Sequence, residues 1–177
     1  AGQLAAESGY RLSTEDLVLT ADELIDELGD WCNDFPIVSL EDPLGDDDWA
    51  AWAAATARLQ GIQVVGDDLF ATQVARLERG IAGGVANAIL LKPNQCGTLS
   101  GAAAAVERAL DAGYAAVVSA RSGETEDCWL ADLAVGWRAG QIKVGSTMRS
   151  ERTAKWNRLL EIEARAGAVA GATRLGV

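Results

Sequence analysis

Short apolar runs recur along the chain, and each of them ends in polar residues. The runs span residues 37–40, 62–65, 88–91 and 115–118, and a shorter one spans residues 141–142. Continuous apolar runs of about four residues are typical of strands that are buried on both faces, as in a parallel sheet. The pattern therefore predicts a parallel sheet that contains these five strands.

Helical patterns separate the apolar runs. The segment 20–23 reads Thr-Ala-Asp-Glu, which is the pattern of a capping box at a helix N-terminus. The alanine-rich segment 99–112 is followed by Gly113, a residue that suits the end of a helix. The predicted helices span residues 20–31, 48–60, 72–81, 99–112, 125–139 and 150–166.

Strands that alternate with helices imply right-handed crossovers and a parallel α/β sheet. A charged residue follows each predicted strand, at separations of 26, 25, 29 and 22 residues: Glu41, Asp67, Lys92, Arg121 and Lys143. In a (β/α)₈ TIM barrel all such strand ends open onto one face, where active sites lie. A doubly wound sheet is the alternative, but it gathers ligands at one crevice and needs no functional residue after every strand. We therefore predict the barrel.

The chain is too short for a whole barrel. A complete one takes about 250 residues, whereas this chain has 177, with five clear strands and room for a sixth near the N-terminus. It begins at Ala1 and its single methionine is Met148. We therefore expect a piece of a longer gene product that supplies only the later strands and helices of a barrel.

Composition and charge exclude several classes of partner. Hydrophobic residues make up 49% of the chain, which is enough for a buried core, and no stretch approaches the length of a membrane span. The net charge of −11 argues against nucleic acid or an anionic membrane as the main partner. The three cysteines show no CxxC spacing and no leader is evident, so we expect a cytoplasmic domain with reduced thiols.

The chain contains no histidine. This absence removes Ser-His, Cys-His and His-metal mechanisms from consideration. Catalysis, if present, must rest on carboxylates, lysines and arginines.

The charged strand ends suggest a metal site that faces a cationic wall. Glu41 and Asp67 would repel each other at the same end of the barrel unless a cation lay between them. Hard oxygen ligands of this kind favour Mg²⁺ or Mn²⁺. Lys92, Arg121 and Lys143 would attract a small polyanion such as a phosphorylated carboxylic acid. A lysine among other cations gives up its proton more readily, so a metal and a lysine base suit proton abstraction beside a carboxylate.

Several segments together resemble the enolase signature series. They read SLEDPL at 39–44, VGDDL at 65–69, LKPNQCGTL at 91–99, VSARSGETED at 118–127, QIKVG at 141–145 and RSERTAKWN at 149–157. The resemblance covers residues 35–166. It implies the C-terminal barrel region of an enolase-type (β/α)₈ fold over residues 1–177, partial and without the N-terminal capping domain.

The resemblance also implies a reaction, which is the Mg²⁺-dependent dehydration of 2-phosphoglycerate to phosphoenolpyruvate in glycolysis. Glu41 and Asp67 would be the Mg²⁺ ligands, and Lys92 would abstract the proton next to the substrate carboxylate. Lys143 would bind that carboxylate and stabilise the enediolate. The phosphate would be held by Arg121 and Ser122. The full-length protein is expected to be a homo-oligomer, as family members are.

Departures from the family pattern leave alternatives open. The family has a histidine where this chain has Ala120, and the best alignment puts Gln3 at the first metal ligand, an aspartate in the family. The family's general-acid glutamate lies in sequence upstream of this chain. One alternative is a paralogue that acts on a related phospho- or phosphono-carboxylate. Another is a non-catalytic protein that keeps the fold for binding.

Overall fold

Five parallel strands form the central sheet of this protein. The computed structural model describes residues 4–6 and 9–166. The strands are β4 (Ser39–Glu41), β5 (Gln63–Gly66), β6 (Ala88–Leu91), β7 (Ala115–Ser119) and β8 (Gly140–Lys143), and they lie side by side in chain order. All five predicted strands are thus confirmed, each within two residues of its expected start.

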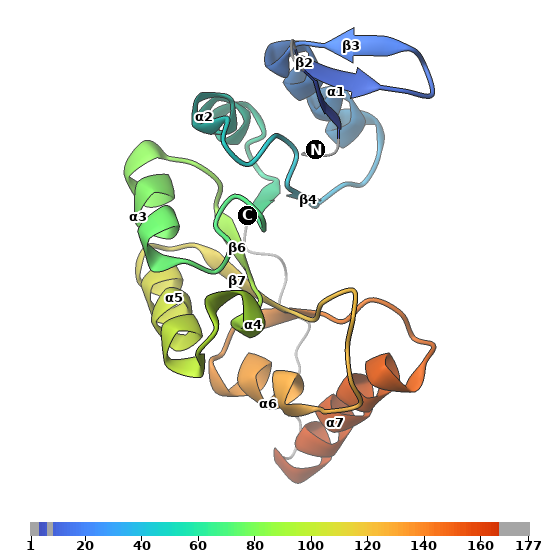
Figure 1. Ribbon diagram of the computed structural model, residues 1–177, viewed down its shortest axis with the longest axis vertical. Coiled ribbons are helices and arrows are strands. Elements are labelled where there is room, and N and C mark those ends of the chain that lie inside the picture. The colour runs from blue at the N-terminus through green and yellow to red at the C-terminus, as the bar shows by residue number, and fades with distance from the viewer. Residues whose placement is uncertain (1–3, 7–8, 167–177) are drawn as a thin grey trace.

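At least one helix follows each of the strands β4, β5, β6 and β7 before the chain enters the next strand of the sheet (Figure 1). The helices of the whole described chain are α1 (Ala21–Asp34), α2 (Trp49–Arg58), α3 (Val74–Gly83), α4 (Pro93–Cys96), α5 (Leu99–Asp111), α6 (Trp129–Gly136) and α7 (Ser150–Ala166). The sheet is curled into half of a barrel. This curl brings the side chains at the carboxyl ends of its outer strands, Glu41 of β4 and Lys143 of β8, within ion-pair distance. This is the predicted α/β barrel architecture, represented by part of its strands.

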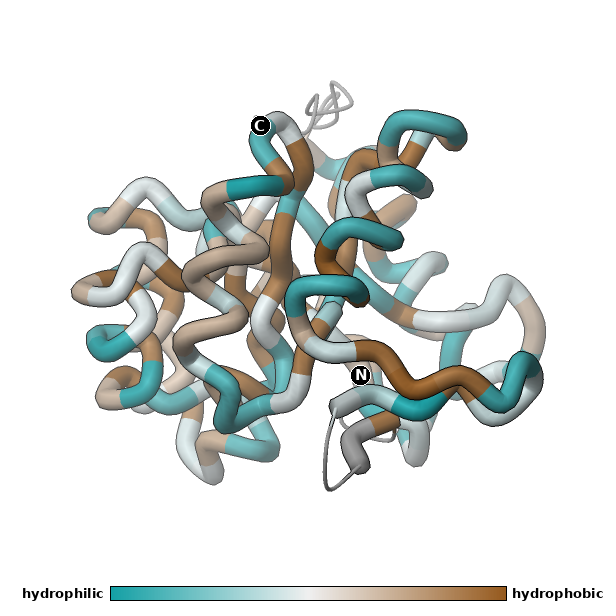
Figure 2. Tube along the Cα trace, turned by 90° about the horizontal axis from the view of Figure 1, so that it is seen from above, coloured by the Kyte–Doolittle hydropathy of each residue, from teal (hydrophilic) through white to brown (hydrophobic). Residues whose placement is uncertain are grey.

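The two faces of the sheet bury different sets of residues. Along β6, Ile89 and Leu91 pack into the main core with the helices, whereas Ala88 and Leu90 join a smaller cluster on the other face. Successive side chains of a strand point to opposite faces, so β6 is apolar at every position because both faces are covered. Figure 2 shows the corresponding alternation of apolar and polar stretches along the surrounding helices.

The N-terminal part differs from the expectation of a sixth barrel strand. β1 (Ala5–Ala6), β2 (Gly9–Leu12) and β3 (Leu17–Leu19) form a separate antiparallel sheet in the order β1-β2-β3. The polar turn between Leu12 and Leu17 brings these two residues opposite each other. A short turn of this kind joins antiparallel strands, whereas a parallel pair needs a long crossover. The Tyr10 hydroxyl accepts a hydrogen bond from the Gly45 N–H at 3.0 Å and ties this small sheet to the segment that follows β4.

Most helix ends follow their sequence signals. The capping box of α1 is confirmed, because Thr20 Oγ1 accepts from the Glu23 N–H at 3.3 Å and Glu23 Oε2 accepts from the Thr20 N–H at 2.8 Å. Helix α5 ends at Asp111, and Gly113 follows its C-cap with a φ of 80°. Helix α7 has the bounds that the sequence predicts.

Helix α6 is the clear exception. It begins at Trp129, four residues after the predicted start, and it ends at Gly136 rather than at residue 139. The preceding residues belong to a loop, because the carbonyl oxygens of Thr125 and Asp127 accept hydrogen bonds from Lys155 of α7 instead of helical ones. In the part of the chain that the structure describes, no helix is both long and apolar enough to cross a bilayer.

Candidate active site

The charged residues that follow the strands lie at one edge of the sheet, as predicted. Glu41 and Lys143 are the last residues of β4 and β8, and Asp67 and Lys92 directly follow β5 and β6. Arg121 lies two residues beyond β7. The strands are parallel, so these positions share the carboxyl-terminal edge, which is the functional face of a (β/α) barrel.

A buried ion pair joins two of these residues. Lys92 Nζ lies 2.5 Å from Asp67 Oδ2, and the side chains keep only 14% and 8% of their accessible surface. The backbone N–H of Lys92 donates to Thr72 Oγ1 at 2.9 Å, which fixes the start of the Lys92 side chain. Charges at this depth are costly unless they are paired. Asp67 and Lys92 therefore hold each other in a defined place.

A second ion pair crosses the mouth from β8 to β4. Lys143 Nζ lies 2.6 and 2.7 Å from the two carboxylate oxygens of Glu41. The four charges thus form two pairs, whereas the sequence suggested an acidic arc that faces a cationic one.

An acidic cluster surrounds Asp67. One oxygen each from Asp42, Asp67 and Asp68 lies within 4.8 Å of the others. Asp42 accepts hydrogen bonds from the backbone N–H groups of Asp67 and Asp68 at 2.8 and 2.9 Å. Burial raises the pKa of Asp42, and the two backbone hydrogen bonds oppose this rise. Sequence reasoning missed Asp42 and Asp68 as members of a site, although each directly follows a predicted ligand.

The atom Asp67 Oδ1 tests whether this edge suits a divalent cation. It is buried and has no hydrogen-bond partner among the described residues, while its sister oxygen binds Lys92. A buried carboxylate oxygen without a partner is unfavourable, and a hard cation satisfies such an atom. The donor set consists of carboxylate oxygens, which suits Mg²⁺. Glu41 lies outside the three-residue cluster, and Gln3 lies outside the described residues.

Arg121 and Ser122 belong to the loop between β7 and α6, here called the 121–128 loop. The N–H of Arg121 donates to Glu124 Oε1 at 2.8 Å, and the carbonyl oxygens of Arg121 and Ser122 accept from Arg152 at 2.8 Å each. No hydrogen bond among the described residues joins either side chain to the other four predicted site residues. The loop thus has a defined backbone, and Arg152 connects it to β8 by donating to the carbonyl oxygens of both Arg121 and Val144.

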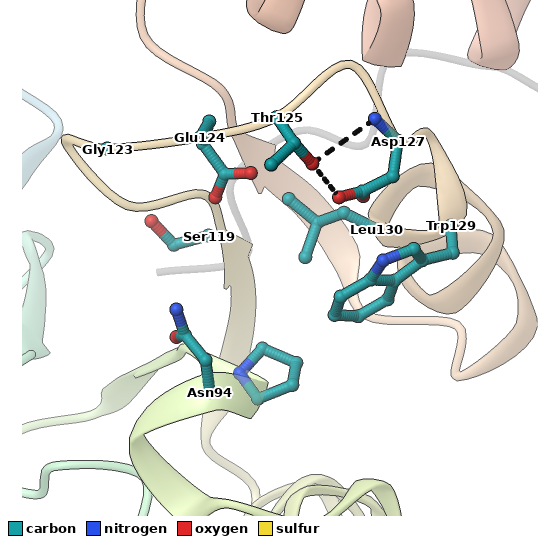
Figure 3. A pocket seen from close by; sticks show the side chains of 9 residues that line it. Asn94, Ser119, Gly123, Glu124, Thr125, Asp127, Trp129 and Leu130 are labelled. Atoms are coloured by element: carbon teal, nitrogen blue, oxygen red, sulfur yellow. Dashed lines mark hydrogen bonds between the residues drawn. The ribbon is translucent and has the colours of Figure 1, made fainter.

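A pocket of about 200 Å³ lies between this loop and α4. Figure 3 shows Glu124 and Asp127 on the loop side, Asn94 on the α4 side, and Ser119 between them. Trp129, at the start of α6, lines the pocket with its ring. The lining combines apolar side chains with the carboxylates of Glu124 and Asp127, so the pocket by itself does not suit an anion.

Two comparisons with known proteins agree with this geometry. Residues 4–173 match the family model described as the C-terminal TIM barrel domain of enolase. The chain is also 51% identical over 164 residues to a curated protein named enolase from Sulfurimonas denitrificans. That match covers 92% of this chain and 39% of the relative, so the chain spans well under half of that protein.

Proposed function

This chain belongs to the enolase family, and we propose that it contributes to an active site that dehydrates 2-phosphoglycerate to phosphoenolpyruvate with Mg²⁺. The observation that carries the proposal is the buried Asp67–Lys92 pair with its unpartnered oxygen. It combines a lysine that can serve as a base with a carboxylate that suits a cation. Both belong to the strand-end edge at which barrel enzymes work.

Glu41 and Asp67 are the residues that we propose as Mg²⁺ ligands. Asp67 offers the unpartnered Oδ1, and Glu41 is the corresponding carboxylate at the end of the neighbouring strand. When bound, the ion would stabilise the enediolate charge that forms on the substrate carboxylate. Asp42 and Asp68 would add negative potential around the site.

Lys92 is the proposed base. In its neutral amine form, Nζ would accept the proton from the carbon next to the substrate carboxylate, and Asp67 Oδ2, which lies 2.5 Å away, would help to hold the ammonium that results. Lys143 would bind the substrate carboxylate by releasing Glu41. Both lysines lie on regular strand ends, which keeps their positions precise.

Arg121 and Ser122 are the proposed phosphate ligands. A guanidinium offers two parallel N–H donors to phosphate oxygens, and a serine hydroxyl adds one more. The substrate-binding set is thus Glu41, Asp67, Lys92, Arg121, Ser122 and Lys143. We assign no general acid for the departing hydroxide to this chain, so we expect the 177 residues alone to have negligible dehydratase activity.

Three further properties belong to the same proposal. We propose that residues 1–177 form part of a barrel domain whose full-length protein also has the N-terminal capping domain of the family. That protein would act in cytoplasmic glycolysis. It would also assemble as a homo-oligomer.

A related substrate is the second candidate, and Ala120 favours it. This residue is buried, directly precedes Arg121, and places a methyl group where the family has a histidine. The site would then prefer a phosphono- or phospho-carboxylate whose shape differs from that of 2-phosphoglycerate. A non-catalytic role is disfavoured, because random substitution in a protein without activity would not be expected to retain two intact ion pairs at the carboxyl ends of the strands.

The deciding experiment follows hydrogen exchange at the substrate. The full-length protein is incubated with 2-phosphoglycerate and Mg²⁺ in D₂O. NMR follows two signals: the loss of the substrate proton on the carbon next to the carboxylate, and the formation of phosphoenolpyruvate. We expect Lys92→Ala to abolish the exchange. Arg165→Ala, at an exposed position near the end of α7, is the control and should leave it intact.

Two results would count against the proposal. Exchange that persists in Lys92→Ala would show that another group is the base. If the wild type neither exchanges the proton nor forms product, but turns over a phosphonate analogue, the second candidate replaces the first.

A further inference from the structure

The ammonium group of Lys155 is completely buried. Its side chain has 0% exposure, although the neighbouring residues of α7, 151–154 and 156–160, are all half-buried or exposed. Lysine is among the residues that are least often buried, because removing the charge from water is unfavourable without compensation. A buried lysine outside the strand-end edge therefore needs a specific reason.

The compensation comes from oxygen atoms on three sides. Lys155 Nζ donates to the carbonyl oxygens of Thr125 and Asp127 at 2.9 Å each, and to that of Glu151 at 3.1 Å. The carboxylate of Glu124 lies 3.2 Å away and balances the charge. An ammonium has three N–H donors, so all of them are used. Two of the three carbonyls, and the carboxylate, belong to the 121–128 loop.

The contact continues from Glu124 to the backbone of Arg121. One oxygen of Glu124 faces Lys155, and the other accepts the hydrogen bond from the Arg121 N–H at 2.8 Å. Figure 3 shows Glu124 reaching from the loop toward Ser119, at the end of β7. The N–H of Arg121 is therefore held in place through Glu124 by Lys155.

Arg152, one turn earlier on the same helix, contacts the peptide groups that follow Arg121. Its guanidinium donates to the carbonyl oxygens of Arg121 and Ser122 at 2.8 Å each. It also donates to the carbonyl oxygen of Val144 at 3.0 Å, directly after Lys143. Residues three apart on a helix face the same way, so Arg152 and Lys155 act on the loop together.

We propose that Arg152 and Lys155 of α7 are positioning residues that hold the backbone of Arg121 and Ser122 in the phosphate-binding geometry. This inference rests on the proposed function, because it concerns the phosphate subsite of that reaction. The hydrogen bonds of Arg152 and Lys155 go to main-chain oxygens, and Lys155 also pairs with Glu124. They act through the peptide groups on both sides of the Arg121 side chain.

The loop needs such support because it has no regular structure of its own. Ser122, Gly123 and Thr125 are exposed, and residues 121–128 belong to neither a strand nor a helix. Ordering such a segment costs conformational entropy, which the contacts with α7 offset. A small displacement of a substrate-binding group is enough to weaken a site substantially.

Attachment of α7 to the rest of the fold does not depend on these two residues alone. Arg158, on the same helix, forms a forked pair with Asp132 of α6 at 2.6 to 3.1 Å. This contact fastens the helix but reaches no residue of the 121–128 loop. Arg158→Ala is therefore the matched control: a cation is lost from the same helix, with the loop contacts intact.

The test compares Lys155→Met with this control in the full-length protein. Amide hydrogen exchange of residues 121–127 is measured together with the affinities for 2-phosphoglycerate and for Mg²⁺. We expect Lys155→Met to speed exchange in the loop and to lower 2-phosphoglycerate affinity by roughly 10- to 100-fold. Its Mg²⁺ affinity should be unchanged. Arg158→Ala should lower the melting temperature and alter neither loop exchange nor either affinity.

A second variant covers the case in which Lys155→Met fails to fold. Lys155→Met/Glu124→Gln removes both buried charges, so no unpaired charge remains to destabilise the protein. It should fold, yet keep the fast loop exchange and the weak 2-phosphoglycerate binding. Normal loop exchange together with normal 2-phosphoglycerate affinity in this variant would overturn the inference. A loss of Mg²⁺ affinity as large as the loss of 2-phosphoglycerate affinity, in either Lys155 variant, would also overturn it.

The two hypotheses fail in different ways. If the wild-type protein does not bind 2-phosphoglycerate, the proposed function is wrong. Loop exchange alone then decides the inference: faster exchange confined to residues 121–127 supports it, and unchanged exchange overturns it.

Discussion

Lys143 contacts both carboxylate oxygens of Glu41, at 2.6 and 2.7 Å, although the two residues are 102 positions apart. They belong to β8 and β4, the outer strands in the order of the sheet. A flat sheet of five strands would keep these ends far apart, because neighbouring strands lie about 4.8 Å from each other. The ion pair is thus a local consequence of the curl of the whole sheet.

This pair should matter more for binding than for stability. The Lys143 and Glu41 side chains keep 47% and 33% of their accessible surface, so solvent screens their attraction. In a double-mutant cycle of Glu41→Gln and Lys143→Met, measured by urea denaturation, we expect a coupling energy of at most about 1 kcal/mol. Lys143→Met should nevertheless abolish measurable binding of 2-phosphoglycerate. A larger coupling energy with intact binding would contradict the assignment of Lys143.

Asp67 should carry the metal affinity. Asp67→Asn replaces the charged carboxylate that has the unpartnered oxygen, so the affinity for Mg²⁺, measured by calorimetry, should fall at least roughly tenfold. Asp111→Asn changes an exposed carboxylate at the end of α5 and serves as the control for net charge. An equal fall in the two variants would indicate general electrostatic attraction rather than a site.

Gln3 should lower the Mg²⁺ affinity of the same site. A neutral amide at the position of a third carboxylate lacks one negative charge, so Gln3→Asp should raise the affinity for Mg²⁺. Calorimetric titration of both proteins measures the difference. An unchanged affinity would mean that Gln3 is not the aligned ligand position.

Tyr114 should limit stability in alkali. Burial raises the pKa of Tyr114 to about 12, above its ordinary value of 10.0. The folded state therefore keeps the phenolic proton longer than the unfolded chain, and stability should fall as the pH rises from 10.0 toward about 12. Tyr114→Phe should remove this loss between the two values. The measurements are urea denaturation across that range and the near-ultraviolet titration of the phenol.

The capping box of α1 should contribute to global stability. Thr20→Ala removes the hydroxyl that accepts from the Glu23 N–H, and we expect a loss of about 1 kcal/mol in the free energy of unfolding. Thr14→Ala, in the exposed turn between β2 and β3, should change this energy by less than about 0.5 kcal/mol. Equal effects of the two changes would show that the cap is not responsible.

The sequence predicted the inner strands of the sheet well, because β5, β6 and β7 are buried along almost their whole length. Such strands are mostly apolar, and a charged residue follows each carboxyl end, as Lys92 follows Leu91. The convergence of these ends followed from parallel topology alone. The antiparallel strands near the N-terminus were missed, although the apolar segments on either side of the polar turn at 13–16 are a hairpin signal.

What the sequence did not predict depends on contacts between distant residues. The start of α6 was placed too early because residues 125–128 carry no strong helix breaker. Lys155, some thirty positions away, helps to hold them as a loop, together with the hydrogen bonds between Thr125 and Asp127. The pairing of Lys92 with Asp67 and of Lys143 with Glu41 likewise depends on which strand ends face each other in space. Spacing along the chain predicted that the charges meet, but not how they pair.

The 121–128 loop is fastened to α7 by its main chain. The carbonyl oxygens of Arg121, Ser122, Thr125 and Asp127 accept hydrogen bonds from Arg152 and Lys155 of α7. Among the described residues, Glu124 is the one loop side chain that contacts α7, and it also accepts from the N–H of Arg121. The shape of the loop is therefore independent of which side chains stand at 121 and 122. Under the proposed phosphate-binding role of Arg121 and Ser122, substitutions at these two positions should change ligand preference while the supporting contacts persist. Natural selection or a protein engineer could then vary specificity here with little loss of stability.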